Sequence, residues 1–309
     1  MSKLRHTTQK AYFRSMQISG AQLFIFVEGK RADRHFYSKI SDPPCSAANI
    51  TCQVATASEV PEAGGGKESL KSFHNFLENQ ELLISDFKGK KTAALFFADK
   101  DIDDLLRIDV RSNYFVYTKT YDLEGTIFQT GDVFGAAAAI GGLGEAEVKH
   151  AIGDKDNWLR QCAETWEQWL VICVYCKKHE LRGIANFGVP SQVNRDLVGD
   201  IDADALAIYI ARMKVASGYS DAKFERSIRA VRRKINKILG EDRHYAVFKG
   251  KWYLLFVAAA IKSIAAGRDV DLRGFHHGLV GAVQMTLAHP NALTEHFVAA
   301  IQATLLLLL

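Results

Sequence analysis

Four short apolar runs in the first part of the chain predict buried β-strands. They are residues 23–27, 50–55, 92–98 and 114–118. The first and third runs lack the polar alternation of a half-exposed strand, which is typical of strands covered on both faces of a parallel sheet. Apolar residues recur at helical spacing over 32–40 and 68–83, between the strands. Strands that alternate with helices in this way predict an α/β fold with crossover connections.

The pattern changes after the glycine-rich segment 141–144, where the strand-like runs stop. From there on the apolar residues recur at helical spacing. The predicted helices cover 157–178, 203–215, 222–239, 252–266 and 278–309. We therefore predict an α/β domain over 1–144 and a mainly α-helical domain over 145–309. Within the first domain, the pair Pro43-Pro44 predicts a loop after the first helix.

The composition is that of a globular protein with a sizeable core. Of 309 residues, 48% are hydrophobic, 24% are charged and only 5 are proline. The 5 cysteines are an odd number and no apolar leader follows the N-terminus, which favours reduced thiols in the cytoplasm. The most hydrophobic stretch, 252–261, ends at Lys262 and is shorter than the ~20 residues that span a membrane. We expect a buried helix there and no membrane association.

The net charge of +4 is mild, but it is distributed unevenly. Over 222–239 an apolar stripe predicts one buried helix face, and seven basic residues stand there against the single acid Glu225. The basic residues are Lys223, Arg226, Arg229, Arg232, Arg233, Lys234 and Lys237. One interpretation is a solvated helix face, and the other is a surface for a polyanion or an acidic partner. In the second case the nucleic-acid-binding residues would be Arg226, Arg229, Arg233 and Lys237, extended by Lys249 and Lys251.

Acidic residues follow three of the predicted strands, where a parallel sheet places its functional groups. Glu28 follows the first strand, Asp99 and Asp101 follow the third, and Glu124 comes after a turn beyond the fourth. The spacing of Asp99 and Asp101 fits a strand end, where residues two apart point the same way. Adjacent strands would bring these carboxylates into one cleft, where a divalent cation relieves their repulsion. The pattern predicts a shared Mg²⁺ site that leaves open positions for water and phosphate.

Two other motifs are rejected, one as an ATPase site and one as a zinc site. The glycines before Lys67 lack the spacing of an ATPase phosphate loop, since Pro61 and Glu68 stand at its required positions. Cys173 and Cys176 have no second cysteine pair and lie in a predicted packed helix, so we expect core residues there and no zinc site.

The strand-end motifs resemble those of a known catalytic domain. Residues 26–30 (Phe-Val-Glu-Gly-Lys) and 96–101 (Phe-Phe-Ala-Asp-Lys-Asp) look like the two motifs of a Toprim domain, and the resemblance covers residues 20–125. Toprim is the catalytic fold of topoisomerases, bacterial primases and overcoming-lysogenization-defect nucleases. Residues 121–124 (Tyr-Asp-Leu-Glu) and 248–252 (Phe-Lys-Gly-Lys-Trp) further resemble a Toprim-like bacterial family encoded beside ABC-type ATPases. That family includes the effector subunit of PARIS-type anti-phage systems.

The resemblance implies a Rossmann-like parallel sheet and a set of catalytic roles. In Toprim enzymes the glutamate after the first strand acts as general acid/base or helps to bind metal, and here it is Glu28. The Asp-x-Asp pair that coordinates Mg²⁺, with Mn²⁺ as the alternative, matches Asp99 and Asp101. The family's further acid matches Glu124, and Asp103 is a candidate ligand of a second metal.

Three further residues lie close to these acids in the sequence. Lys30 and Lys100 are candidates to touch the scissile phosphate. Lys100 could equally balance charge while pointing away from the site. Asp33 begins the first helix, so helix capping is its expected role.

The function implied by the resemblance is that of a metal-dependent endonuclease. It would be the toxic effector of a bacterial anti-phage system, located in the cytoplasm and held inactive by an ABC-type ATPase sensor until infection. Its substrate would be nucleic acid, either RNA such as tRNA or DNA, and a homodimer is a further option. The alternative is a non-catalytic module, in which the Toprim cleft docks or regulates a partner and the basic helix binds the ATPase or nucleic acid.

Overall fold

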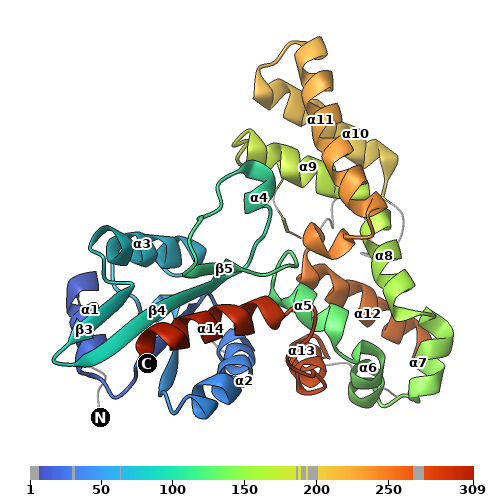
Figure 1. Ribbon diagram of the computed structural model, residues 1–309. Coiled ribbons are helices and arrows are strands. Elements are labelled where there is room, and N and C mark those ends of the chain that lie inside the picture. The colour runs from blue at the N-terminus through green and yellow to red at the C-terminus, as the bar shows by residue number, and fades with distance from the viewer. Residues whose placement is uncertain are drawn as a thin grey trace. The chain divides into compact units, whose positions relative to one another are not determined.

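The computed structural model describes residues 7–29, 32–62, 64–185, 187–188, 193, 201–266 and 275–309 (Figure 1). These residues divide into two compact units. Unit 1 comprises Met1–Lys100, Ile108–Lys119 and Ala288–Leu309, and unit 2 comprises Asp101–Arg107 and Thr120–Leu287. Unit 1 carries the β-sheet, whereas the regular elements described in unit 2 are all helices.

Unit 1 is built on a mixed sheet of five described strands. They are β1 (Leu23–Val27), β2 (Cys52–Thr56), β3 (Ile84–Phe87), β4 (Lys90–Ala98) and β5 (Phe115–Tyr117). The strand order is β2-β1-β4-β3, and β5 also pairs with β4. β1 pairs in parallel with both β2 and β4, so that Val27 lies opposite Thr56 on one side and Phe97 on the other. All residues of β1 are buried, as its unbroken apolar run predicts.

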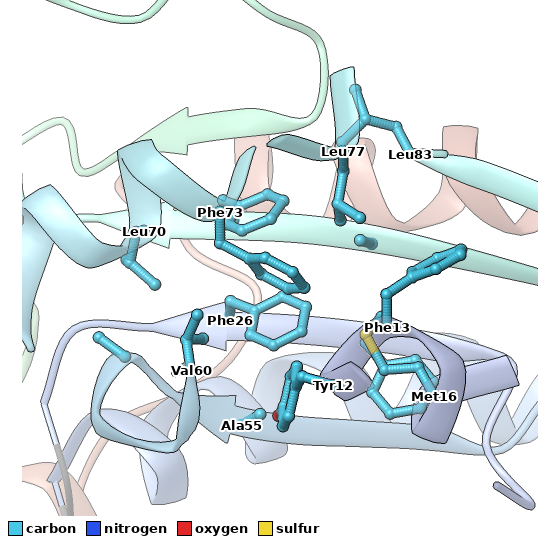
Figure 2. Packing of buried hydrophobic residues seen from close by; sticks show 14 of the residues in the cluster. Tyr12, Phe13, Met16, Phe26, Ala55, Val60, Leu70, Phe73, Leu77 and Leu83 are labelled. Carbon is cyan, nitrogen blue, oxygen red and sulfur yellow. The ribbon is translucent and has the colours of Figure 1, made fainter. Parts of the chain in front are cut away.

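Four α-helices cover the two faces of this sheet (Figure 1). They are α1 (Gln9–Ile18), α2 (Ala32–Ala47), α3 (Gly66–Asn79) and α14 (Glu295–Leu308). On one face, Phe26 of β1 stacks on Phe96 of β4 with ring centroids 5.1 Å apart, and Phe73 of α3 meets Phe26 edge-on. Tyr12 of α1 contacts the rings of Phe26 and Phe73. Figure 2 shows this cluster, in which α1 and α3 close over the strands.

Side chains that alternate with these residues along the strands pack on the opposite face. Tyr37 of α2 lies 5.2 Å from the ring of Phe97 in β4. Phe297 of α14 contacts both of these rings, at 5.2 Å and 4.7 Å. The C-terminal helix therefore completes the core of the sheet, far from its neighbours in the sequence.

Unit 2 consists of helices. The described α-helices are α4 (Asp103–Leu106), α5 (Leu123–Thr130), α6 (Val133–Gly141), α7 (Glu145–Ile152), α8 (Lys155–Thr165), α9 (Glu167–Lys178), α10 (Ala203–Ser217), α11 (Asp221–Gly240), α12 (Gly250–Ile264) and α13 (Phe275–Met285). A short 3-10 helix lies at His244–Ala246 in this unit, and another lies at Ala57–Glu59 in unit 1. Trp166, between α8 and α9, is fully buried and packs on Trp252 and Phe256 of α12. Large aromatic side chains thus form the centre of this helical unit.

The sheet is mixed, which corrects the predicted parallel sheet. β3 runs antiparallel to β4 and is joined to it by a two-residue turn. Lys88 and Gly89 in that turn have φ values of 56° and 79°, the positive pair that a type I′ hairpin turn requires. β3 escapes the sequence prediction because it is short and lies at the sheet edge, with Asp86 and Phe87 exposed. It has no buried apolar run to mark it.

Three predicted helix boundaries are wrong. α2 continues through Pro43 and Pro44, where a loop was expected. The carbonyl of Pro44 still accepts the N–H of Ala48 at 3.2 Å, and Cys45 is buried, so the last turn is held after the prolines. The single helix expected over 157–178 is divided at Trp166, and the one expected over 278–309 is divided between α13 and α14.

The compact units divide the chain at positions other than the predicted domains 1–144 and 145–309. Unit 2 takes in the chain from Thr120, because α5 and α6 pack on α12 and α13. The chain from Ala288 onwards is again part of unit 1, because α14 packs on α2 and β4. Both differences come from contacts between segments that are distant in the sequence.

Among the residues that the structure describes, every helix is too short or too polar to cross a membrane. The five cysteines are thiols and form no disulfide. Cys173 and Cys176 are buried in α9, as expected for core residues.

His74 in α3 is a buried core histidine that should make the fold sensitive to acid. Its ring meets the rings of Phe96 and Phe115 edge-on, at 5.3 Å and 5.4 Å, and its Nε2 atom has no hydrogen-bond partner. Burial lowers the pKa of His74 below its ordinary value of 6.5. The unfolded chain therefore binds a proton first on acidification, so the contribution to stability is full above about pH 6.5 and falls as the pH drops towards the folded pKa.

We expect the His74→Phe substitution to remove this acid sensitivity. Urea unfolding of both proteins at pH 7.5 and pH 5 measures it, and other titrating groups cancel in the difference between the proteins. The wild type should lose stability relative to the variant on acidification, with a slope of at most about 1.4 kcal/mol per pH unit. Equal pH dependence of the two proteins would contradict the assignment.

Candidate functional site

Glu28 and Asp99 meet at one edge of the sheet in unit 1. Glu28 follows β1 and Asp99 follows β4, and these strands are parallel neighbours. The backbone N–H of Asp99 donates a hydrogen bond to Oε1 of Glu28 at 2.9 Å. Both residues are partly exposed, so solvent and a ligand can reach this edge. The sequence predicts that these two strand ends lie together, and in the structure they touch.

The turn after Glu28 is closed by the side chain of Asp33. The N–H of Gly29 donates to Oδ2 of Asp33 at 2.7 Å, just before α2 begins. A Cβ atom at position 29 would lie 2.3 Å from Oδ1 of Asp33, so this close approach favours glycine. Asp33 thus holds the turn between β1 and α2, and its expected capping of the helix stays a prediction. Lys30, a predicted phosphate contact, lies outside the described residues.

Lys100 reaches towards the chain that follows β5. Its N–H donates to Oγ1 of the buried Thr118 at 2.9 Å, and its ammonium donates to the carbonyl of Lys119 at 3.2 Å. The two interpretations of Lys100, contact with the phosphate and charge balance away from the site, both stay predictions. Thr118 fixes the backbone directly after Asp99 and was missed by the sequence analysis, since no motif marks it.

An ion pair of Arg34 and Glu59 stands beside the end of β2. Thr56, the last residue of β2, lies opposite Val27, so it shares the sheet edge of Glu28. Its hydroxyl donates to Oε1 of Glu59 at 3.3 Å, and Arg34 binds the same oxygen. The Arg34 side chain is 42% exposed, which places a reachable cation at this edge. Sequence analysis missed the pair because Arg34 stands in a helical first turn without a motif.

Asp101 and Asp103 belong to unit 2. β4 ends at Ala98 and Asp101 has a left-handed backbone with φ 50°, so Asp99 and Asp101 do not share a strand as their spacing suggested. The N–H of Asp101 donates to the carbonyl of Tyr121 at 2.6 Å. Asp103 begins α4, and its side chain is only 3% exposed.

Glu124 stands in the first turn of α5, next to two residues that define its surroundings. Its Oε1 lies 3.4 Å from Nζ of Lys251 in α12. Asp122 caps α5 by accepting the N–H of Gly125 on Oδ1 at 2.8 Å. Burial raises the pKa of Asp122 to about 7, and the nearby carboxylate of Glu124 adds to the rise. The sequence marks Asp122 only as part of the motif 121–124 and gives it no role, although Asp is a preferred N-cap residue.

The basic residues of α11 lie on its exposed side. Phe224, Ile228, Val231, Ile235 and Ile238 are buried, which confirms the predicted apolar stripe. The seven basic residues predicted for the other side are all exposed: Lys223, Arg226, Arg229, Arg232, Arg233, Lys234 and Lys237. We call these seven side chains the α11 basic surface. Clustered cations on one helix face attract a polyanion.

Lys249 and Lys251 stand at the start of α12 and have partners of their own there. The ammonium of Lys249 donates to the carbonyl of Phe187 at 2.9 Å. Lys251 pairs with Glu124, a candidate catalytic acid. The sequence predicts Lys251 as a nucleic-acid-binding residue, and in the structure its ammonium also lies beside the carboxylate of Glu124.

No family model matches the chain, and no curated protein matches it. The functional inference therefore rests on the residues of the site.

The carboxylates at the sheet edge suit a hard divalent cation. Among the described residues, no group of three or more His, Cys, Asp or Glu side chains is arranged to hold a metal. Mg²⁺ keeps several waters and is bound in enzymes by one or two carboxylates together with substrate phosphates. Glu28 and Asp99 supply carboxylate oxygens at one partly exposed edge. If a metal binds at this edge, Glu28 and Asp99 are the residues that would hold it, and their oxygen donors are of the kind that Mg²⁺ and Mn²⁺ take.

Proposed function

We propose that the protein is a Mg²⁺-dependent nuclease of the Toprim type that hydrolyses phosphodiester bonds in nucleic acid. The observation that carries this proposal is the contact of Glu28 with Asp99, at the carboxyl edge of two parallel strands. Functional groups of parallel sheets gather at this edge. The two residues are also those at which the sequence resembles the acid/base and the first metal ligand of Toprim enzymes.

Glu28 moves the proton of the reaction in this proposal. The N–H of Asp99 orients the carboxylate by binding Oε1. A carboxylate held in this way can take a proton from the attacking water and return it to the leaving group. Mg²⁺, when bound, neutralises the charge that develops on the phosphate oxygens. Asp99 would hold the metal with Glu28, and the resemblance assigns Asp101, Asp103 and Glu124 to the same reaction.

The α11 basic surface binds the polyanion in this proposal. Its seven cations are exposed on one side of a helix whose other side is buried. Ion pairs with phosphates give binding that is strong at low salt and largely independent of sequence. The surface therefore supports a nucleic-acid substrate and does not by itself separate RNA from DNA.

The biological role that we propose rests on the resemblance alone. The protein would be the toxic effector of a bacterial anti-phage system and would be held inactive by an ABC-type ATPase sensor. Expression of the chain with and without the product of its neighbouring gene tests this role. Toxicity that the neighbouring product suppresses, and that phage infection releases, is the expected result.

A cleavage assay tests the enzymatic part of the proposal. The purified protein is incubated with plasmid DNA and with total tRNA, in Mg²⁺, Mn²⁺ or EDTA, alone and with the neighbouring gene product. Cleavage that requires the metal is the expected result. Binding without cleavage under every condition would reject the nuclease and favour a non-catalytic binding module.

A further inference from the structure

One buried carboxylate caps two helices that are far apart in the sequence. Oδ1 of Asp122 accepts the N–H of Gly125 in the first turn of α5 at 2.8 Å. The same atom accepts the N–H of Gly250, the first residue of α12, at 2.9 Å across 128 positions of the chain. The first N–H groups of a helix have no partners within it and carry a partial positive charge. Asp122 therefore joins the N-termini of α5 and α12.

The two helix starts are in direct backbone contact at this joint. A Cβ atom at position 250 would lie 2.0 Å from the nitrogen of Gly125 and 2.4 Å from Oδ1 of Asp122. No other residue fits there unless the helices separate. We call Asp122, Gly125 and Gly250 the clasp.

The clasp places the next residue of α12 at a candidate catalytic acid. Lys251 follows Gly250 directly, and its Nζ lies 3.4 Å from Oε1 of Glu124. Glu124 is itself only two residues from Asp122. The Lys251 side chain is 57% exposed and that of Glu124 is 19% exposed, so the ammonium stands at the solvent side of the pair. A cation in this position can meet a phosphate that approaches Glu124.

Capping of α5 alone would not require the buried carboxylate of Asp122. Its Oδ2 is buried and has no hydrogen-bond partner. Serine or threonine would cap α5 without burying a carboxylate oxygen in this state. What the longer acceptor adds is the second hydrogen bond, to Gly250, and through it the position of Lys251.

We propose that Asp122 is a positioning residue of the nuclease, which holds α12 on α5 so that Lys251 contacts the substrate phosphate beside Glu124. The inference rests on the proposed function. Asp122 touches no substrate and acts through Lys251. Loss of the clasp removes both hydrogen bonds, so the start of α12 shifts and the ammonium of Lys251 moves with it; a displacement of about 1 Å at a reacting centre costs roughly 100-fold in rate.

Single substitutions with a matched control test the clasp. Asp122→Ala removes both hydrogen bonds, and Asp122→Asn keeps an oxygen that can accept them. Asp132 caps α6 in the same Asp-x-x-Gly arrangement, with Gly135 N–H 3.0 Å from its Oδ1, so Asp132→Ala is the control for loss of a cap. We expect cleavage to fall roughly 100-fold in Asp122→Ala, to return to within about tenfold of wild type in Asp122→Asn, and to stay unchanged in Asp132→Ala.

A double substitution separates positioning from general destabilisation. Lys251→Met should lower kcat/KM, and adding Asp122→Ala to it should lower kcat/KM no further, because both changes remove the same contact. Independent factors that multiply in the double variant would overturn the proposal. So would equal activity of Asp122→Ala and Asp132→Ala, or wild-type activity of Lys251→Met. If Asp122→Ala does not fold, Asp122→Ser replaces it, since serine still caps α5 but is shorter.

A readout without catalysis keeps the inference separate from the nuclease proposal. Lysines are ¹³C-dimethylated, which preserves their charge, and the NMR signal of Lys251 is identified by its loss in Lys251→Met. Asp122→Ala should move that signal towards the position of a solvated lysine, whereas Asp132→Ala should leave it in place. An unmoved signal refutes the clasp even if the wild type cleaves. A moved signal in a protein that never cleaves supports the clasp and rejects the nuclease.

Discussion

Replacing Glu28 by glutamine is expected to lower metal-dependent cleavage by roughly 10²–10⁴-fold, the range of a lost general acid or base. Glutamine keeps an oxygen at the place where Glu28 accepts the N–H of Asp99. The turn after β1 is therefore preserved, while the negative charge and the proton acceptor are lost. Alanine would also take away the hydrogen-bond acceptor, so glutamine separates chemistry from structure. Initial rates in saturating Mg²⁺, together with thermal unfolding, measure the two effects.

Glu68→Gln is the control for this substitution. Glu68 lies in unit 1 and its side chain is 86% exposed. The Glu68→Gln substitution makes the same chemical change at a residue without a proposed role, so the cleavage rate of this variant should equal that of the wild type. Full activity of Glu28→Gln in Mg²⁺ would falsify the assignment of Glu28, whatever the outcome for the control.

The central strands could be predicted from the sequence because burial on both faces leaves a local mark. β1 and the part of β4 over 93–98 are unbroken apolar runs, and both strands occur within two residues of their predicted positions. β3 is short and half exposed, so its residues carry no such mark. The place of α14 could not be predicted either. Phe297 of α14 packs in the core of unit 1 against Tyr37 and Phe97, and neither of these residues is near it in the sequence.

The same distinction holds for the contacts of the candidate site. The contact of Glu28 with Asp99 could be predicted because neighbouring parallel strands end at one edge. The pairing of Glu124 with Lys251 could not, because it depends on a hydrogen bond from Gly250 to Asp122 across the helical unit. Local patterns fix which residues end a strand or start a helix. They do not fix which two helix starts meet.

Replacing Arg226, Arg229 and Arg233 together by glutamine is expected to weaken nucleic-acid binding by roughly 10- to 100-fold at low salt. Each lost phosphate contact also lowers the salt dependence of binding, so the slope of log K against log salt should fall by up to about 3. Glutamine has nearly the helix propensity of arginine, and the three side chains are exposed, so α11 should stay folded. Fluorescence anisotropy with a labelled oligonucleotide in EDTA measures binding without cleavage.

The matching control is a second triple substitution in the same unit, of Lys149, Arg160 and Lys262 to glutamine. These residues are exposed and lie outside α11, so the variant has the same net charge as the first. If binding depended on net charge alone, the two variants would weaken it equally and lose the same salt slope. If the α11 basic surface is the contact, only the first variant shows a smaller slope of log K against log salt. The salt dependence therefore decides between a local surface and a diffuse field, which the affinity at a single salt concentration cannot do.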